Sequence, residues 1–261
     1  AQPLMTILHP EKMSDIINTM LHIHQQQGKL PVWHLMGCET NCMVGNPGVP
    51  VVADAILKDI KGFDTELAFK ALKESSMLPE RGMEHRIEYG FIPADKMTEA
   101  IAYDMEYAIA DWAVAQAAQK LGKQEDYEYF LKRSKSYKNY FDASTGFMRG
   151  KMLDGSWRTP FSPYASSHRD DDYCEGNAWQ YTWLVPHDVE GLVECFGSKE
   201  AFVNKLDSLF LANGDMGEAS SPDISGLIGQ YAHGNEPSHH TVYLYTLVGQ
   251  PWKTADRIKE I

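Results

Sequence analysis

Hydrophobic positions recur at helical spacing along most of the chain. Between residues 98 and 121, apolar side chains recur at alternating steps of four and three, and Gly122 follows them. This spacing predicts one amphipathic helix that ends at the glycine. A second helix is predicted from Gln124, with one apolar face that continues as far as Phe141. The short link between them predicts an antiparallel helical hairpin.

The same arrangement is predicted before and after this hairpin. Asp188 and Ser198 each precede an apolar pattern of helical spacing, and Pro237 and Pro251 each stand where a first helical turn is expected. Earlier helices are expected at about residues 11 to 26, 50 to 61 and 64 to 76. About nine helices in pairs, with little strand-like alternation and no heptad seam, predict an all-α fold. We expect an (α/α)6 toroid-like helical domain, present as an incomplete fragment with long loops.

Three segments lack helical periodicity. Residues 143–187 and 213–236 are long and rich in Gly, Ser and Asp. Loops of this length in a compact domain commonly form binding loops or lids. The shorter segment 77–97 is predicted to be a solvated connection that can also hold site residues. Its charged residues are Arg81, Glu84, His85, Arg86 and Glu88, among others.

Composition excludes some classes of partner. The chain has 24 Lys and Arg against 36 Asp and Glu, a formal charge of −12, with the acidic residues spread widely. A protein that binds nucleic acid or a strongly anionic membrane needs a basic face, so neither partner is expected. No apolar run approaches the roughly 20 residues that span a bilayer, and the first residues lack the features of a signal peptide.

The four cysteines, Cys38, Cys42, Cys174 and Cys195, are too few for a disulfide scaffold. Cys38 and Cys42 can form a bridge or bind a metal, but small buried free thiols are the favoured interpretation.

Carboxylates and large aromatic residues gather at the end of the first long loop, in residues 170–183. Sugar sites combine aromatic faces that stack on the rings with polar groups that take the hydroxyls. A carboxyl held among aromatic residues has a raised pKa, so Glu175 can act as an acid. Alternatively, Trp179 and Trp183 form one face of a buried helix and Glu175 is only a cap or an ion-pair partner. Asp170 to Asp172 are expected to be a solvated acidic run without a catalytic role.

A second polar group lies in His233-Gly234-Asn235-Glu236-Pro237-Ser238-His239-His240. Oxygen atoms of Asn235 and Glu236 suit a hard cation such as calcium. The imidazoles suit zinc instead, but they lack an HExxH arrangement. The structural alternative makes Asn235 a helix cap, Pro237 a first-turn residue and the histidines part of the core.

A third stretch, residues 37–55, precedes a predicted helix and is not a phosphate-binding loop. Asn46 and Asp54 can face a ligand there, or the glycines and prolines only shape a turn. The chain also lacks the GxSxG sequence of a serine hydrolase.

Several of these segments together resemble glycoside hydrolase family 92. The resemblance is carried, in order along the chain, by Val44 to Lys58, Glu175-Gly176-Asn177-Ala178-Trp179-Gln180-Tyr181 with Trp183, Pro186-His187-Asp188, His233 to His240, and Gly249-Gln250-Pro251-Trp252-Lys253-Thr254. Members of that family are calcium-dependent exo-α-mannosidases that invert the anomeric centre. They combine an N-terminal β-sandwich with a helical toroid.

The resemblance implies roles for particular residues. Glu175 corresponds to the general acid of the family. The expected calcium ligands are Asn235, Glu236 and His239. The expected contacts with mannose are Trp179, His233, Asn235 and Glu236.

It also implies a domain organisation. Residues 1–261 are expected to be part of the helical catalytic domain, with the β-sandwich, the C-terminal end of the toroid and the catalytic base outside them. The chain is therefore expected to be truncated, to associate with the missing parts of its parent chain, and to have little activity alone. The expected substrate is a mannose-containing oligosaccharide, with α-1,2 linkages as the default, and the parent is expected to be periplasmic or secreted. The alternatives are a noncatalytic mannose-binding helical module and, third, a zinc hydrolase.

Overall fold

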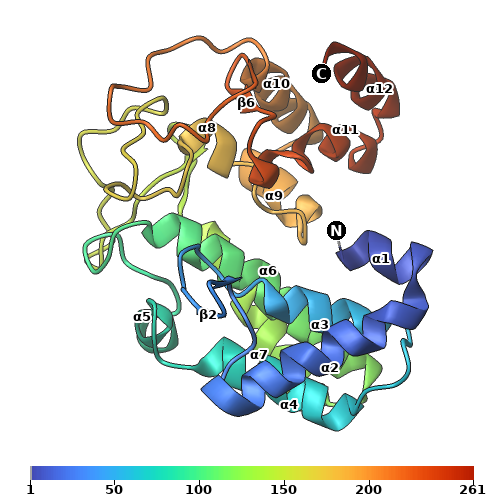
Figure 1. Ribbon diagram of the computed structural model, residues 1–261. Helices are drawn as coiled ribbons and strands as arrows, with labels where there is room; N and C mark the ends of the chain where they lie inside the picture. Colours follow the sequence, from blue (N-terminus) through green and yellow to red (C-terminus); the bar gives the residue numbers. More distant parts are fainter. Residues whose placement is uncertain (1) are drawn as a thin grey trace. The chain divides into compact units, whose positions relative to one another are not determined.

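The computed structural model describes residues 2–261, which form two compact units. Unit 1 contains residues 2–91 and 103–136, and unit 2 contains residues 92–102 and 137–261. Helices make up most of unit 1, as the hydrophobic periodicity predicts, and they are the main regular elements of unit 2 (Figure 1).

Unit 1 holds most of the long helices. They are α1 (Gln2–Leu8), α2 (Pro10–Gln27), α3 (Gly48–Leu57), α4 (Thr65–Met77), α5 (Met83–Tyr89), all but the first turn of α6 (Ala100–Lys120), and α7 (Gln124–Arg133). A short antiparallel hairpin, β1 (His34–Leu35) and β2 (Cys38–Glu39), lies between α2 and α3. The helices predicted at residues 11–26, 64–76 and 98–121 are confirmed. The one predicted at 50–61 is confirmed but ends earlier, at Leu57.

The core of unit 1 lies between α2, α3, α4, α6 and α7 (Figure 1). Helix α6 contributes mostly alanines to it, so neighbouring helices pack closely against its backbone, while the larger side chains come from the other helices. The buried residues include Met13, Ile17, Val52, Phe69, Leu72, Ala110, Val114, Ala117 and Phe130.

Arg86 shows that the predicted solvated connection is partly wrong. The segment folds into α5, and Arg86 is only 3% exposed. Its guanidinium forms ion pairs with two buried carboxylates of α6, at 3.3 Å from Asp104 and 3.0 Å from Asp111. Asp111 also pairs with Arg133 of α7, at 2.9 Å. Charges withdrawn from water need such partners, so this network ties α5, α6 and α7 together.

A second polar contact holds the β1–β2 hairpin. The carboxylate of Glu39 accepts hydrogen bonds from the backbone N–H groups of Val32, Trp33 and Asn41, at 2.8, 3.0 and 2.9 Å. Desolvation raises the pKa of this carboxyl, but the backbone donors together outweigh it and lower the pKa to about 2.

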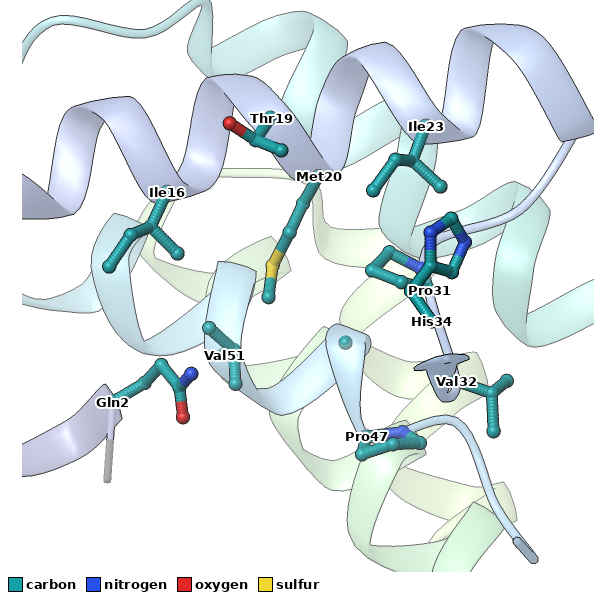
Figure 2. Close-up of a pocket in the computed structure, with 11 residues that line it drawn as sticks. Gln2, Ile16, Thr19, Met20, Ile23, Pro31, Val32, His34, Pro47 and Val51 are labelled. Carbon is teal, nitrogen blue, oxygen red and sulfur yellow. The ribbon is translucent and has the colours of Figure 1, made fainter. Parts of the chain in front are cut away.

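A groove of about 400 Å³ lies on unit 1 beside these elements. Figure 2 shows its wall, formed by Ile16, Met20 and Ile23 of α2 together with Pro47 and Val51. His34 is the one titratable side chain in the lining, and it lies 3.5 Å from Glu39. The groove is therefore apolar and offers no carboxyl group for acid–base chemistry.

Unit 2 combines short helices with long irregular segments. Its elements are the 3-10 helix η1 (Ser136–Asn139, whose first residue belongs to unit 1), β3 (Phe141–Asp142), β4 (Phe147–Met148), α8 (Ala178–Tyr181), α9 (Val189–Phe196), α10 (Lys199–Leu209), β5 (Leu227–Ile228), β6 (Tyr231–Ala232), η2 (Glu236–Ser238), η3 (Thr241–Tyr243), α11 (Leu244–Leu247) and α12 (Pro251–Glu260). The cap predicted at Asp188 is confirmed, since its side chain accepts from the backbone N–H of Gly191 at 3.1 Å. The next helix starts where it was predicted, and the Ser198 side chain caps it by accepting from the backbone N–H of Ala201 at 3.0 Å.

Two predicted helices are shorter than expected. The helix that begins at Gln124 ends at Arg133, and the chain continues through η1 into strand β3, so Phe141 is not on its face. The helix predicted from Pro237 to Leu247 is divided into η2, η3 and α11. The imidazole of His240 lies 2.6 Å from the carbonyl oxygen of Trp183, a distant partner that the local periodicity does not reveal.

Cys38 and Cys42 do not form the alternative disulfide, but Cys38 is exposed and Cys42 is half-buried, so the expectation of buried thiols at these two positions is wrong. Within residues 2–261, no helix has the length and apolar character needed to cross a membrane.

The Arg86 network gives a stability prediction. Replacing Arg86 with Met leaves Asp104 and Asp111 buried with less compensating charge, which should cost about 3–5 kcal/mol of unfolding free energy. The matched control is Lys70→Met, which removes a solvated ion pair with Glu74 and should cost less than about 0.5 kcal/mol. Urea unfolding followed by circular dichroism measures both, and equal losses would contradict the role given to Arg86.

The Glu39 contact predicts a pH dependence. Because the folded-state pKa of Glu39 lies below its ordinary value of 4.5, its contribution is complete above that value and is lost as the pH falls toward 2. Glu39→Gln should therefore cost about 1–3 kcal/mol at neutral pH, and the difference from the parent should vanish in acid. Urea unfolding across this pH range tests it, with the exposed Glu88→Gln as the control. A difference that does not change with pH would refute the assignment.

Candidate functional site

Glu175 lies immediately before α8, but it does not cap that helix. Asn177 is the cap: its Oδ1 accepts from the N–H groups of Trp179 and Gln180, and the Gln180 side chain accepts from the N–H of Asn177 at 2.7 Å. This reciprocal capping box satisfies the first turn of α8. The structural alternative in which Glu175 serves as the cap is therefore wrong.

The backbone of Glu175 is left-handed, with φ of 50°. A non-glycine residue in this region costs of order 1 kcal/mol and persists where its surroundings enforce it. Tyr181 fixes the residue before Glu175. Its hydroxyl donates to the carbonyl oxygen of Cys174 at 2.7 Å and accepts from the Cys174 N–H at 3.2 Å. The residue after Glu175 is constrained as well. The backbone of Gly176 packs so closely against the Tyr181 ring that a Cβ there would lie 2.7 Å from it.

Asn235 is the residue that the fold brings to Glu175. Its Nδ2 donates to both the carbonyl oxygen and the side-chain Oε2 of Glu175, each at 3.2 Å. The two residues come from segments 60 positions apart. Both line one small cavity, whose other lining residues are Gln180, Tyr181, Leu184, Ala232, Pro237 and Ser238. The structure thus joins the two sequence segments that carry the predicted site.

The electrostatics of this cavity raise the pKa of the Glu175 carboxyl. Burial raises the pKa of its carboxyl, and the hydrogen bond from Asn235 opposes that rise in part. The nearby charge of Asp223 raises it further, while His168 and Arg169 lower it. The net direction is upward from the ordinary value of 4.5, which is the direction that a general acid needs.

Trp179 does not line this cavity. It is 7% exposed, and its ring contacts Phe147 edge-on with 4.8 Å between ring centroids and Tyr164 at 5.9 Å. Trp183 is fully buried against Phe196 and Phe202. For both tryptophans the structure supports the alternative in which they belong to the core.

The other predicted site residues lie close to Asn235 in the sequence but are more exposed. The Nδ1 atom of His233 is 3.0 Å from the Tyr231 hydroxyl, and His239 Nε2 is 3.0 Å from the carbonyl oxygen of His233. His233 and His239 line a separate groove of about 250 Å³ that includes Ile258. Glu236 is exposed at the first position of η2.

The donor atoms determine which metal this segment suits. Calcium takes oxygen ligands, and Asn235 and Glu236 both offer them, so these two residues fit the ion. His239 fits less well, because it offers nitrogen and its Nε2 already contacts a carbonyl oxygen. In residues 2–261, no group of three or more His, Cys, Asp and Glu side chains is arranged to hold a metal.

The acidic run before Glu175 is solvated only in part. Asp170 is exposed, as expected, but Asp172 is 4% exposed and pairs with Arg158 at 2.7 Å. Asp171 accepts from the N–H groups of Ser167 and Tyr173. The expectation of a solvated run is therefore wrong for Asp171 and Asp172, whose carboxylates hold the chain that leads to Glu175.

The third candidate stretch is structural. Asn46 donates to the carbonyl oxygen of Ser75 at 3.0 Å, and Asp54 pairs with Lys58 at 2.8 Å on the surface of α3. Neither side chain is directed by these contacts to a ligand, and Gly45, with φ of 75°, shapes the turn before α3.

Two contacts that hold the segments of the site were not predicted from the sequence. The Asn177–Gln180 spacing, a cap residue followed three positions later by Gln, is a recognisable capping pattern. Gln230 has no local pattern of that kind. It is 3% exposed, and its side chain accepts from Asn177 Nδ2 at 2.9 Å, a contact that only the tertiary structure reveals.

Comparison with known structures identifies proteins of similar fold. A family GH92 α-mannosidase from Bacteroides thetaiotaomicron, solved in complex with mannoimidazole, is 41% identical, with a TM-score of 0.93 over 99% of this chain and 35% of that chain. The family GH92 inverting mannosidase from Bacteroides thetaiotaomicron VPI-5482 is 32% identical, with a TM-score of 0.87 over 99% of this chain and 37% of that chain. These superpositions confirm the predicted toroid-like helical class.

Sequence comparison gives the same answer. An uncharacterized secreted glycosidase from Arthroderma benhamiae is 26% identical over 285 residues, which cover 95% of this chain and 34% of that protein. The chain therefore spans about a third of the length of the relatives it matches. The family model for the glycosyl hydrolase family 92 catalytic domain matches residues 1–261 of the sequence. From its sequence and its fold alike, the chain belongs to glycosyl hydrolase family 92.

Proposed function

We propose that the protein carrying this chain is an inverting exo-α-mannosidase with Glu175 as its general acid. The observation that supports this most strongly is the pairing of Glu175 and Asn235 in one cavity, with burial raising the pKa of the Glu175 carboxyl. The solved relatives described as α-mannosidases support the substrate class.

In this mechanism Glu175 donates its proton to the glycosidic oxygen as the bond from that oxygen to the anomeric carbon breaks. The released sugar hydroxyl keeps the proton, and Glu175 becomes a carboxylate. Asn235 Nδ2, already 3.2 Å from Oε2, donates a hydrogen bond to the charge that forms there. A water molecule attacks the opposite face of the sugar and loses its proton to a second carboxylate. Inversion places the two carboxyl groups roughly 6.5–9.5 Å apart.

We propose that the second carboxylate lies outside residues 1–261. By resemblance to the family we expect that base C-terminal to the Pro251–Lys253 segment, and the match to a solved relative covers only 35% of that relative's chain. We likewise propose that a β-sandwich and the remaining helices of the toroid complete the catalytic domain. Residues 1–261 alone are then expected to have little or no activity.

We propose calcium as the cofactor, with Asn235 and Glu236 among its ligands. When bound, the ion would hold sugar hydroxyls and stabilise the distorted ring of the transition state. His239 is the weaker of the expected ligands, and we assign its imidazole and that of His233 to the separate groove that they line. The substrate is expected to be a mannose-containing oligosaccharide, with α-1,2 linkages as the default. Export from the cell is expected as well, since one relative is described as secreted.

Catalysis gives the first functional prediction. A protein extended to the length of the solved relatives should hydrolyse α-1,2-mannobiose, whereas residues 1–261 alone should not. Glu175→Gln in the extended protein should lower kcat by about 100-fold to 10,000-fold, because only protonated Glu175 supplies the proton. Released mannose, measured by chromatography, reports each rate. Turnover by residues 1–261 that survives Glu175→Gln would contradict both the missing base and the acid.

Metal binding gives the second functional prediction. Calcium should raise the melting temperature of the extended protein and restore activity after EDTA, because ligands stabilise the state that binds them. Glu236→Gln should weaken calcium binding by about tenfold or more in isothermal titration calorimetry. Glu190→Gln removes an exposed carboxylate of α9 and serves as the matched control. Unchanged calcium affinity in Glu236→Gln would remove Glu236 from the ligand set.

A further inference from the structure

The contact between Glu175 and Asn235 is one of two cross-links between the same two chain segments. The first segment runs from Glu175 to Asn177, and the second runs from Gln230 to Asn235. At one end, Asn235 Nδ2 donates to Glu175. At the other end, Asn177 Nδ2 donates to Gln230 Oε1 at 2.9 Å. The two segments and two cross-links therefore form a closed ring, in which the position of one end constrains the other.

The Gln230 end of this ring is firmly held. Gln230 is in the turn between β5 and β6, its backbone N–H donates to the carbonyl oxygen of Leu209 at 2.8 Å, and its own carbonyl oxygen accepts from Gln180 Nε2 at 2.7 Å. Gly229, with φ of 59°, packs so closely that a Cβ would lie 2.4 Å from the backbone of Phe210. The turn is thus fixed against the end of α10 and the start of α8.

The Asn177 end is equally fixed. Asn177 is fully buried, and besides capping α8 its Nδ2 donates to the carbonyl oxygen of Tyr164 at 3.0 Å. Neither Asn177 nor Gln230 lines the cavity that contains Glu175. They can therefore influence Glu175 only indirectly, through the segments that they join and through Gln180, which contacts both residues and lines the cavity.

We propose that Gln230, through its hydrogen bond with Asn177, is a positioning residue that sets the Glu175–Asn235 contact and with it the aim of the acid proton. This inference rests on the proposed function. A shorter or apolar side chain at residue 230 would leave Asn177 Nδ2 with Tyr164 as an acceptor but remove the acceptor of its second N–H, and it would loosen the β5–β6 turn. Asn235 would then lose its fixed place beside Glu175, and a misplaced acid transfers its proton poorly.

The dependence on the leaving group distinguishes this role from a loss of folding. A disaccharide leaves as an alkoxide and needs the proton, whereas dinitrophenolate leaves without one. In the extended protein, Gln230→Met, which is close in size but has no amide, should lower kcat on α-1,2-mannobiose by about tenfold and on 2,4-dinitrophenyl α-mannoside by less than about twofold. Gln230→Asn keeps a buried amide but withdraws it by one methylene, and it should show the same selective loss if the Met variant does not fold.

Two further variants complete the test. Gln230→Glu keeps an acceptor at Oε1, so it should return the ratio of the two rates toward that of the parent. Leu206→Ala creates a void in α10 at a fully buried position outside the ring. Its lower melting temperature should reduce both rates equally, which is the behaviour expected of a purely structural residue.

The outcomes are distinguishable from a failure of the proposed function. If the parent hydrolyses neither substrate, the proposed function itself fails. If the parent is active and Glu175→Gln shows the selective loss on the disaccharide, the acid is established independently of Gln230. In that case an equal loss on both substrates in Gln230→Met and Gln230→Asn overturns the positioning role.

Discussion

The left-handed backbone of Glu175 is the local constraint on which the rest of the site depends. A glutamate does not adopt φ of 50° without enforcement, and the structure supplies it from both directions along the chain. On the N-terminal side, Tyr181 takes both backbone groups of Cys174. On the C-terminal side, Asn177 is committed to capping α8. Glu175 and Gly176 must bridge these two fixed points, and this places the Glu175 carboxyl within reach of Asn235.

Polar contacts also hold the irregular segment of unit 2 that leads to Glu175. A loop that only connected helices would be free to vary, whereas residues 167–177 are held by specific polar contacts. The carboxylates of Asp171 and Asp172 accept backbone and guanidinium donors there. Polar groups buried in this way stabilise one conformation because every alternative leaves them unpaired. The loop that carries the site is therefore held in place by specific hydrogen bonds and an ion pair.

Much of the fold could be predicted from the sequence, because the information that specifies amphipathic helices is local. The spacing from residue 98 to 121, the cap at Asp188 and the helix start at Ser198 are examples, and the structure has all of them. Arg86 shows the limit. Its charge indicates solvent, and only its pairing with Asp104 and Asp111, residues of a different helix, makes its burial possible. The 237–247 segment shows it too, since the contact of His240 with Trp183 lies outside any local window.

The residues of the candidate site likewise fall into those that the sequence could predict and those that it could not. Glu175 and Asn235 could be selected because each is in a recognisable motif, and the fold brings the two motifs together. The mannose contact expected for Trp179 came from its residue type and from the family resemblance, and neither indicates that its ring is buried against Phe147 and Tyr164. Gln230 could not be found at all, because its importance comes from a partner 53 residues away.

The most direct measurement of the central claim is the anomeric form of the first mannose released, followed by proton NMR during hydrolysis of an α-mannoside by the extended protein. Protonation by Glu175 with attack of water from the opposite face predicts that β-mannose forms first and then mutarotates. The first product would be α-mannose if the enzyme retained the anomeric configuration through a covalent intermediate. That result, or the release of no mannose, would contradict the account of Glu175 as the acid of an inverting α-mannosidase.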